Sequence, residues 1–148
     1  MKRIYWLKND DAAYSPRAIQ KSRNLSLSSD SPYGVVAEFG LYGSEEWWEN
    51  IQRGKIPTRI TEGRVIGLFE EGQDRSGVPN SVEIETLDGC RVKRSIRFSN
   101  EPESERLKVG YKIKLVEIIQ KLKTPSLSID GDGTVSKLIE AFVDNSCK

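Results

Sequence analysis

The alternation of hydrophobic and polar positions predicts a chain built mainly of β-strands. Its clearest part is residues 81–98, where two alternating runs flank the segment Leu87-Asp88-Gly89. A two-residue turn would place the apolar residues of the two runs on opposite faces of the sheet, so we predict a three-residue loop with Gly89 in the left-handed conformation. That loop leaves Arg94 near Val82 on the inner face, which only a position at the edge of the sheet would explain. The cross-strand pairs that it predicts are Ile84 with Val92, Glu85 with Arg91, and Glu83 with Lys93.

Four more segments have the composition of strands, namely residues 3–7, 34–42, 59–69 and 107–123. Inside the third, Gly63 and Gly67 indicate a bulge or the close approach of another backbone. The alternation of the fourth breaks from Val116, where a bulge or a strand end is expected. One face of this fourth segment carries Leu107, Val109, Tyr111, Ile113 and Leu115. Polar and small residues predict loops at 24–34, 70–80 and 99–106.

One short helix is predicted near residues 44–53, within the stretch YGSEEWWENIQRGKIP. Ser44 is a favourable N-cap, and the two glutamates that follow fall in the first turn, where the helix dipole favours negative charge. Gly54 stands where a C-terminal glycine belongs, and Pro57 prevents the helix from continuing.

The helix carries two adjacent tryptophans, Trp47 and Trp48, both within reach of Ile51 on an apolar stripe. Because consecutive helical residues point about 100° apart, we expect one tryptophan in the core and the other at its rim. The alternative is that the exposed one anchors a binding partner. Three glutamates surround the pair, and they are expected to serve as dipole partners and solubilising groups.

The composition is typical of a single soluble domain spanning residues 1–148, with 36% hydrophobic and 30% charged residues. No apolar run approaches the roughly 18 residues that a membrane span needs. The first 16 residues lack the apolar region of a secretory signal. Two cysteines, Cys90 and Cys147, make no disulfide framework. We therefore expect the protein in the cytoplasm, which is a reducing compartment.

Histidine is absent from the sequence. Its absence removes the most common general base and metal ligand, and it excludes Ser-His-Asp and Cys-His nucleophilic sites. Two cysteines are too few for a structural zinc site, which needs four ligands. We therefore assign no catalytic residue, cofactor or metal, and we expect the chain not to be an enzyme. An enzymatic alternative would need a cleft with paired acids of raised pKa.

Residues 128–140, SIDGDGTVSKLIE, match a calcium-binding loop of the EF-hand type only in part. With Ser128 at the first position, Asp130 and Asp132 fall where acidic ligands belong. The first position then lacks its aspartate, and Ile139 stands where a bidentate glutamate is needed. We expect a polar turn between two strands.

Charge is distributed in blocks along the chain. Residues 30–90 contain five basic and twelve acidic side chains, whereas residues 91–123 contain ten basic and four acidic ones. The basic block reads strand–turn–strand–loop–strand, as an OB-like barrel would, and such barrels bind single strands with basic and aromatic side chains. Only Phe98 and Tyr111 supply rings there, and both are assigned to the core, so a solvated sheet face is favoured. The alternative nucleic-acid site would use Arg91, Lys93, Lys112 and Lys114.

The run YGSEEWWENIQRGKIPTRITEGR, residues 42–64, resembles a group of small, poorly characterised bacterial proteins. These share a YGSxEWWxxIxxGxIP segment that leads into a glycine-containing strand. Similar chains end in a hydrophobic strand with an acidic finish, which LIEAFVD (138–144) matches. Residues 135–143 have both helical spacing and strand alternation, and the resemblance favours a strand. Some proteins of this size and composition are similar to immunity proteins, which bind and neutralise a toxin domain.

Together these patterns predict an α+β fold, mostly an antiparallel β-sheet as a small barrel or sandwich, with one short helix near 44–53. The resemblance implies a non-enzymatic, cytoplasmic protein-binding module of the bacterial immunity type. The acidic residues of 30–90 suit a basic partner, such as a nuclease toxin. Binding of single-stranded nucleic acid through 91–123 is the alternative. The residues expected to bind the protein partner and occlude its active site are Glu45, Glu46, Trp48 and Glu49.

Overall fold

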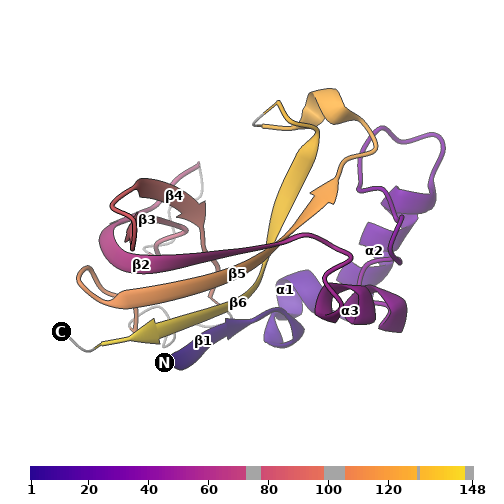
Figure 1. Ribbon diagram of the computed structural model, residues 1–148. Coiled ribbons are helices and arrows are strands. Elements are labelled where there is room, and N and C mark those ends of the chain that lie inside the picture. The colour runs from indigo at the N-terminus through magenta and orange to yellow at the C-terminus, as the bar shows by residue number, and fades with distance from the viewer. Residues whose placement is uncertain (73–77, 99–105, 130, 146–148) are drawn as a thin grey trace. The chain divides into compact units, whose positions relative to one another are not determined.

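The computed structural model describes residues 1–72, 78–98, 106–129 and 131–145. Its strands form one antiparallel sheet in the order β1-β6-β5-β2-β3-β4 (Figure 1). The strands are β1 Lys2–Trp6, β2 Thr58–Phe69, β3 Ser81–Thr86, β4 Arg91–Ser95, β5 Lys112–Lys121 and β6 Thr134–Asp144. The helices are α1 Asp11–Tyr14, α2 Pro16–Leu27 and α3 Glu45–Gln52, with 3-10 turns η1 Leu7–Asn9 and η2 Pro125–Leu127.

The predicted fold class is confirmed, because the chain is α+β and its sheet is antiparallel. The sheet is open, with β1 and β4 as its two edges, and so it is neither closed into a barrel nor stacked as a sandwich. Both edge strands are short and carry basic side chains. Such edges resist further strand pairing.

The described residues divide into two compact units, each assembled from separate stretches of chain. Unit 1 consists of the described residues within 1–10, 60–116 and 138–148. Unit 2 consists of the described residues within 11–59 and 117–137. Strands β2, β5 and β6 contribute residues to both units, whereas the three α-helices belong to unit 2 alone. The single domain expected from the chain length stays a prediction.

The β3–β4 hairpin of unit 1 has the register that the sequence predicts. The opposed pairs are Ile84 with Val92, Glu85 with Arg91, and Glu83 with Lys93. Gly89 closes the three-residue turn with a φ of 87°, the left-handed conformation that glycine adopts without steric cost. Arg94 lies opposite Val82 on β4, which is an edge strand. The edge position explains how a charged residue is tolerated there.

Both glycines of β2 have the roles that the sequence suggests. The backbone of β3 approaches Gly63 so closely that an added Cβ would overlap the Glu85 carbonyl oxygen. The pairing of β2 with β3 shifts register between Val65 and Gly67, as at a bulge. The core of unit 1 is aliphatic, with buried side chains that include Ile4, Val65, Val82, Ile84, Ile113, Leu115 and Ile139.

The N-terminal part of unit 2 was not predicted correctly. Two helices, α1 and α2, follow β1 where none was expected, and α2 extends into the predicted loop at 24–34. A sequence signal for α2 existed, because the Ser15 hydroxyl accepts a 3.1 Å hydrogen bond from the Ala18 amide and Pro16 occupies the first helical position. No residue of α2 is fully buried, so its apolar stripe is weak.

The strand predicted at 34–42 is wrong. Within that segment only Val35 pairs, in an isolated antiparallel bridge with Leu122. Gly34 and Gly40 have φ values of 105° and 110°, which turn the backbone away from an extended path.

The strand predictions for 3–7, 59–69 and 135–143 are confirmed by β1, β2 and β6. The predicted strand at 107–123 is shorter, because β5 begins at Lys112. Val109, expected in the core, is 59% exposed, since the chain turns at Gly110 with a φ of 99°. The expected break in alternation is seen where Glu117 and Ile118 are buried in succession. Most of one predicted loop (99–105), Asp130 and Cys147 lie outside the described residues.

Candidate functional site

Helix α3 forms for the reasons that the sequence indicates. The Ser44 hydroxyl accepts a 3.1 Å hydrogen bond from the Trp47 amide and caps the helix. At the other end Gly54 has a φ of 75° and donates its amide to the Ile51 carbonyl at 3.2 Å. The result is a short helix with defined ends, and it carries all four residues predicted to bind a partner.

The two adjacent tryptophans of α3 have different environments, as predicted. Trp47 is fully buried, whereas Trp48 is half-buried at the rim. The Trp48 ring meets the rings of Trp47 and Tyr14 edge to face, at centroid distances of 4.8 and 5.9 Å. Its Nε1 donates a 2.8 Å hydrogen bond to the Tyr14 hydroxyl. Tyr42 packs against Trp47 and Tyr14, so four rings form one cluster whose geometry fixes the orientation of Trp48.

The three glutamates of α3 lie on its exposed surface. Glu45, Glu46 and Glu49 are all exposed, and no salt bridge to them is found among the described residues. Glu45 and Glu46 stand in the first turn, where they interact favourably with the helix dipole. Glu45, Glu46 and Glu49, together with the exposed part of Trp48, are accessible to a partner.

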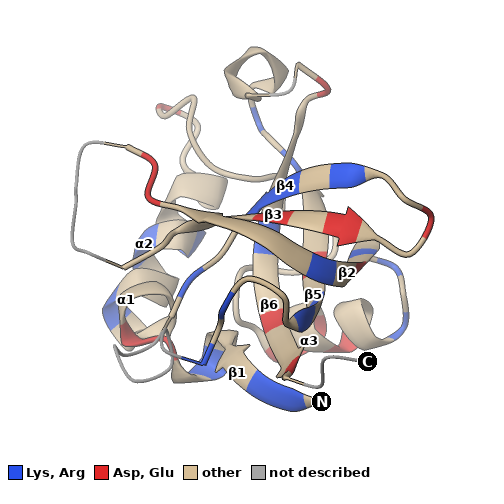
Figure 2. Ribbon diagram, turned by 90° about the vertical axis from the view of Figure 1, so that its left-hand side faces the viewer, with Lys and Arg blue, Asp and Glu red and all other residues tan. Residues whose placement is uncertain are grey.

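The basic residues of the alternative nucleic-acid site lie on unit 1 beside acidic ones. Their acidic neighbours are Glu71 at 2.9 Å from Lys93, Glu62 at 3.8 Å from Lys114, and Glu85 opposite Arg91. Lys112 is half-buried. Figure 2 shows basic residues on β4 next to acidic residues on β3. Alternating charges of this kind weaken the positive field that attracts a nucleic-acid backbone.

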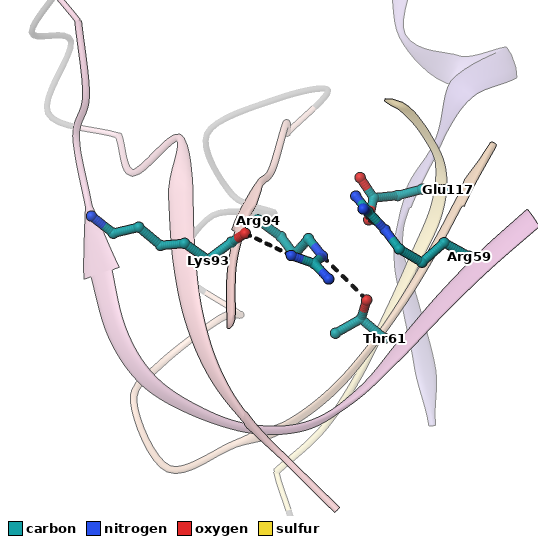
Figure 3. A network of polar contacts seen from close by, with 5 residues as sticks. All are labelled: Arg59, Thr61, Lys93, Arg94 and Glu117. Carbon is teal, nitrogen blue, oxygen red and sulfur yellow. Dashed lines mark hydrogen bonds and ion pairs between the residues drawn. The ribbon is translucent and has the colours of Figure 1, made fainter. Parts of the chain in front are cut away.

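Two polar arrangements were not predicted from the sequence (Figure 3). In unit 1 the Arg94 guanidinium donates to the Thr61 hydroxyl at 3.4 Å and to the Lys93 carbonyl at 3.0 Å. In unit 2 Arg59 donates two hydrogen bonds, of 3.1 and 3.3 Å, to one carboxylate oxygen of Glu117. The Glu117 side chain is only 3% exposed, so Arg59 compensates a charge that burial disfavours. The sequence signals were Arg94 at an inward-facing position of its strand and, for Glu117, an acidic residue inside the hydrophobic run LVEII.

Another buried carboxylate, Asp10, lies in unit 1. It accepts hydrogen bonds of 2.8 Å from the Tyr5 hydroxyl and 2.8 Å from Arg97 Nε. Burial, followed by the bond to Asp10, raises the pKa of Tyr5 well above its usual value. The bond to Asp10 also raises the pKa of Arg97. No local pattern in the sequence indicates this cluster, because Asp10 and Arg97 are 87 positions apart in the chain.

Within the described residues, no group of three or more cysteine or acidic side chains is placed to bind a metal ion. Asp132, a ligand in the partial calcium-loop match, instead accepts hydrogen bonds of 3.0 Å from the Thr134 amide and 3.0 Å from the Ser128 hydroxyl. Bonds from Thr134, and then from Ser128, lower the pKa of Asp132. This carboxylate therefore stabilises the turn itself.

No helix in the described part of the chain combines the length and the apolar character that crossing a membrane requires. The features above define a small α+β protein with an open antiparallel sheet, an aromatic cluster on α3 and an exposed acidic helix surface. Over residues 1–143 its sequence matches the family described as Immunity protein RhsI2. The chain therefore belongs to the RhsI2 immunity protein family, which confirms the immunity-type resemblance. Comparison with curated proteins gives no match.

Proposed function

We propose that this protein binds a toxin domain and neutralises it in the bacterial cytoplasm, as a binding protein and not as an enzyme. The family match over residues 1–143 carries the proposal. The buried carboxylates also support it, because Asp10 and Glu117 are each hydrogen-bonded to an arginine. Carboxylates held in this way are suited to a structural role more than to proton transfer.

The surface that we assign to the toxin is the exposed side of α3, defined by Glu45, Glu46, Trp48 and Glu49. Accessible carboxylates around a fixed aromatic ring combine electrostatic attraction with an anchor of low conformational entropy. This surface suits a basic patch on the toxin, and its binding would occlude the toxin's active site. Trp48 contributes only the exposed part of its ring, since the ring also packs against Trp47 and Tyr14.

The test is capture of partners from a lysate of the source cell on the tagged protein, with and without nuclease treatment. We expect one protein partner that survives nuclease and is lost with the variant Glu49→Lys. This substitution places a lysine in the second half of α3, where the helix dipole favours positive charge, so it should leave the fold intact. The matched control is Asp30→Lys, which reverses an exposed acidic residue in a loop of the same unit.

Two results would contradict the proposal. Recovery of nucleic acid alone, released by moderate salt, would move the function to the basic strands. Equal capture by the Glu49→Lys and Asp30→Lys variants would show that the exposed side of α3 does not contact the partner. Circular dichroism of each variant confirms that loss of capture is not loss of the fold.

A further inference from the structure

A pocket of about 330 Å³ opens in unit 2 next to the C-terminal end of α3. Its walls come from Val36 and residues 38–40, from 55–57, from 119–121 of β5, and from Thr134 of β6. Pockets for complete small-molecule ligands measure about 300–1,000 Å³. The pocket lies at the lower end of this range, and its volume is sufficient for one large side chain.

Hydrogen bonds hold the walls of the pocket to one another. The Asn50 side chain of α3 donates to the Phe39 carbonyl at 2.9 Å, and the Asn50 carbonyl accepts from the Ile56 amide at 3.2 Å. Across the pocket, the Val36 amide donates to the Lys121 carbonyl at 2.8 Å. The pocket is therefore built into the fold, and α3 positions one of its walls.

The interior of the pocket is apolar. Ile56 is buried, Phe39 and Ile119 are half-buried, and Val36 stands 42% exposed at the opening. An apolar group that enters this space loses contact with water, which contributes about 25 cal/mol for each Å² of apolar surface removed. The chemistry of the interior selects an aromatic or large aliphatic group.

Three charged residues stand at the rim, and they leave one positive charge uncompensated. Lys121 lies 4.0 Å from Glu38, so these two form an ion pair at long range. Lys55 is exposed, and none of the salt bridges among the described residues includes it. A carboxylate on the occupant would complement the ammonium group of Lys55.

We propose that this pocket receives a large apolar side chain of the toxin domain, with a carboxylate next to that side chain facing Lys55. The inference rests on the proposed function, because it assigns the occupant to the toxin. It adds a second contact of defined chemistry to the acidic surface of α3. An apolar anchor buried in a preformed pocket is the type of contact that contributes most to interface affinity.

The chemistry of the pocket is tested first on the full chain without the toxin, by NMR titration of the ¹⁵N-labelled protein. The probe is acetyl-Phe-Asp-amide, and acetyl-Phe-Lys-amide is its charge-reversed control. We expect the Asp peptide to shift the amide signals of Val36, Ile56 and Ile119, and the Lys peptide to shift them less. The variant Val36→Trp, which fills the opening, should abolish these shifts, whereas Leu127→Trp, at an exposed apolar position outside the pocket, should not. Shifts confined to other residues, or none at peptide concentrations on the order of 10 mM, would overturn the inference.

The second test uses the toxin identified by capture. We expect Val36→Trp and Lys55→Glu each to lower the affinity for the toxin by about tenfold or more, which corresponds to loss of one important interface contact. The matched controls are Leu127→Trp and Lys21→Glu, the latter an exposed lysine of α2. Unchanged affinity in both pocket variants would overturn the inference while leaving toxin binding established. Failure of the wild-type protein to capture any toxin would instead contradict the proposed function, and the NMR result would then concern only the chemistry of the pocket.

Discussion

At the scale of single residues, the tryptophans of α3 show how neighbouring identical side chains come to differ. The 100° step of the helix directs Trp47 into the core of unit 2 and leaves Trp48 at the rim. The sequence predicted one tryptophan in the core and one at the rim, but which of the two is buried follows only from the structure. The contacts of Trp48 with Tyr14 could not be predicted either, because Tyr14 belongs to a helix that was not predicted.

The difference in burial predicts a difference in stability between two truncations. We expect Trp47→Ala to lower the free energy of unfolding by about 3–5 kcal/mol, as is usual for loss of a buried aromatic side chain. Trp48→Ala should cost less, about 1–3 kcal/mol, because its ring is already partly in water, although the hydrogen bond to Tyr14 is lost. Urea unfolding of the two variants and the wild type measures both losses of unfolding free energy. An equal or reversed order of costs would contradict the core-and-rim assignment.

The cluster of Tyr5, Asp10 and Arg97 predicts a pH dependence at alkaline pH. The folded state raises the pKa of Tyr5, mainly through burial, so tyrosine ionises at lower pH in the unfolded chain than in the folded one. Its contribution to stability is therefore complete below about pH 10, the pKa of the unfolded group, and is lost as the pH rises further.

The variant Tyr5→Phe isolates this contribution. At neutral pH we expect it to be about 1–3 kcal/mol less stable than wild type, because it loses the hydrogen bond to the buried Asp10. The gap should stay constant up to about pH 10 and narrow between about pH 10 and pH 12, which denaturant unfolding at a series of pH values measures. A gap that stays constant over this interval would show that Tyr5 does not resist ionisation in the folded state.

At the scale of elements, the helices and strands that could be predicted from the sequence are those with clear turn or capping residues at their ends. The β3–β4 hairpin and α3 were predicted nearly residue by residue, because Gly89, Ser44 and Gly54 specify their turns and caps. The strand predicted at 34–42 is wrong, because the segment has the composition of a strand but its backbone has positive φ at Gly34 and Gly40. Helix α2 was not predicted, because it has no buried residue and contacts with distant parts of the chain stabilise its end. Lys123, almost a hundred positions away, donates hydrogen bonds to the Leu25 and Ser28 carbonyls at its end.

The cap of α3 predicts a measurable cost for removing one hydroxyl group. Ser44→Ala should destabilise the protein by about 1 kcal/mol, because the Trp47 amide loses its acceptor. Ser29→Ala, in an exposed loop of the same unit, is the control and should change stability by less than about 0.5 kcal/mol. Thermal or urea unfolding measures both. If the two variants were equally stable, the Ser44 cap would contribute nothing to α3.

At the scale of the whole molecule, the sequence predicted the fold class and the type of protein but not the arrangement of the sheet. Antiparallel pairing followed from hairpin signals, whereas the neighbours of β1 and β5 depend on contacts between residues far apart in the chain. The charge blocks of the sequence do not show how charges are distributed in space. Basic residues of 91–123 are brought beside acidic residues of neighbouring strands, an arrangement that a linear count does not reveal.

This interleaving of charge predicts weak binding of nucleic acid. Titration of the protein with a fluorescent single-stranded oligonucleotide should show little binding at physiological salt. A steep salt dependence, with a slope of about −0.7 for each phosphate neutralised, would indicate several basic contacts. Loss of that slope in Lys93→Ala and Lys114→Ala variants would then establish the nucleic-acid alternative.

Neutralisation of the toxin by direct binding is best tested by titrating the activity of the captured toxin with this protein. We expect the activity to fall in proportion to added protein and to reach its minimum at about one equivalent, as for tight binding without turnover. Full toxin activity in the presence of excess folded protein would contradict neutralisation by binding. Complete inactivation by far less than one equivalent would show turnover, and so an enzyme instead of a binding protein.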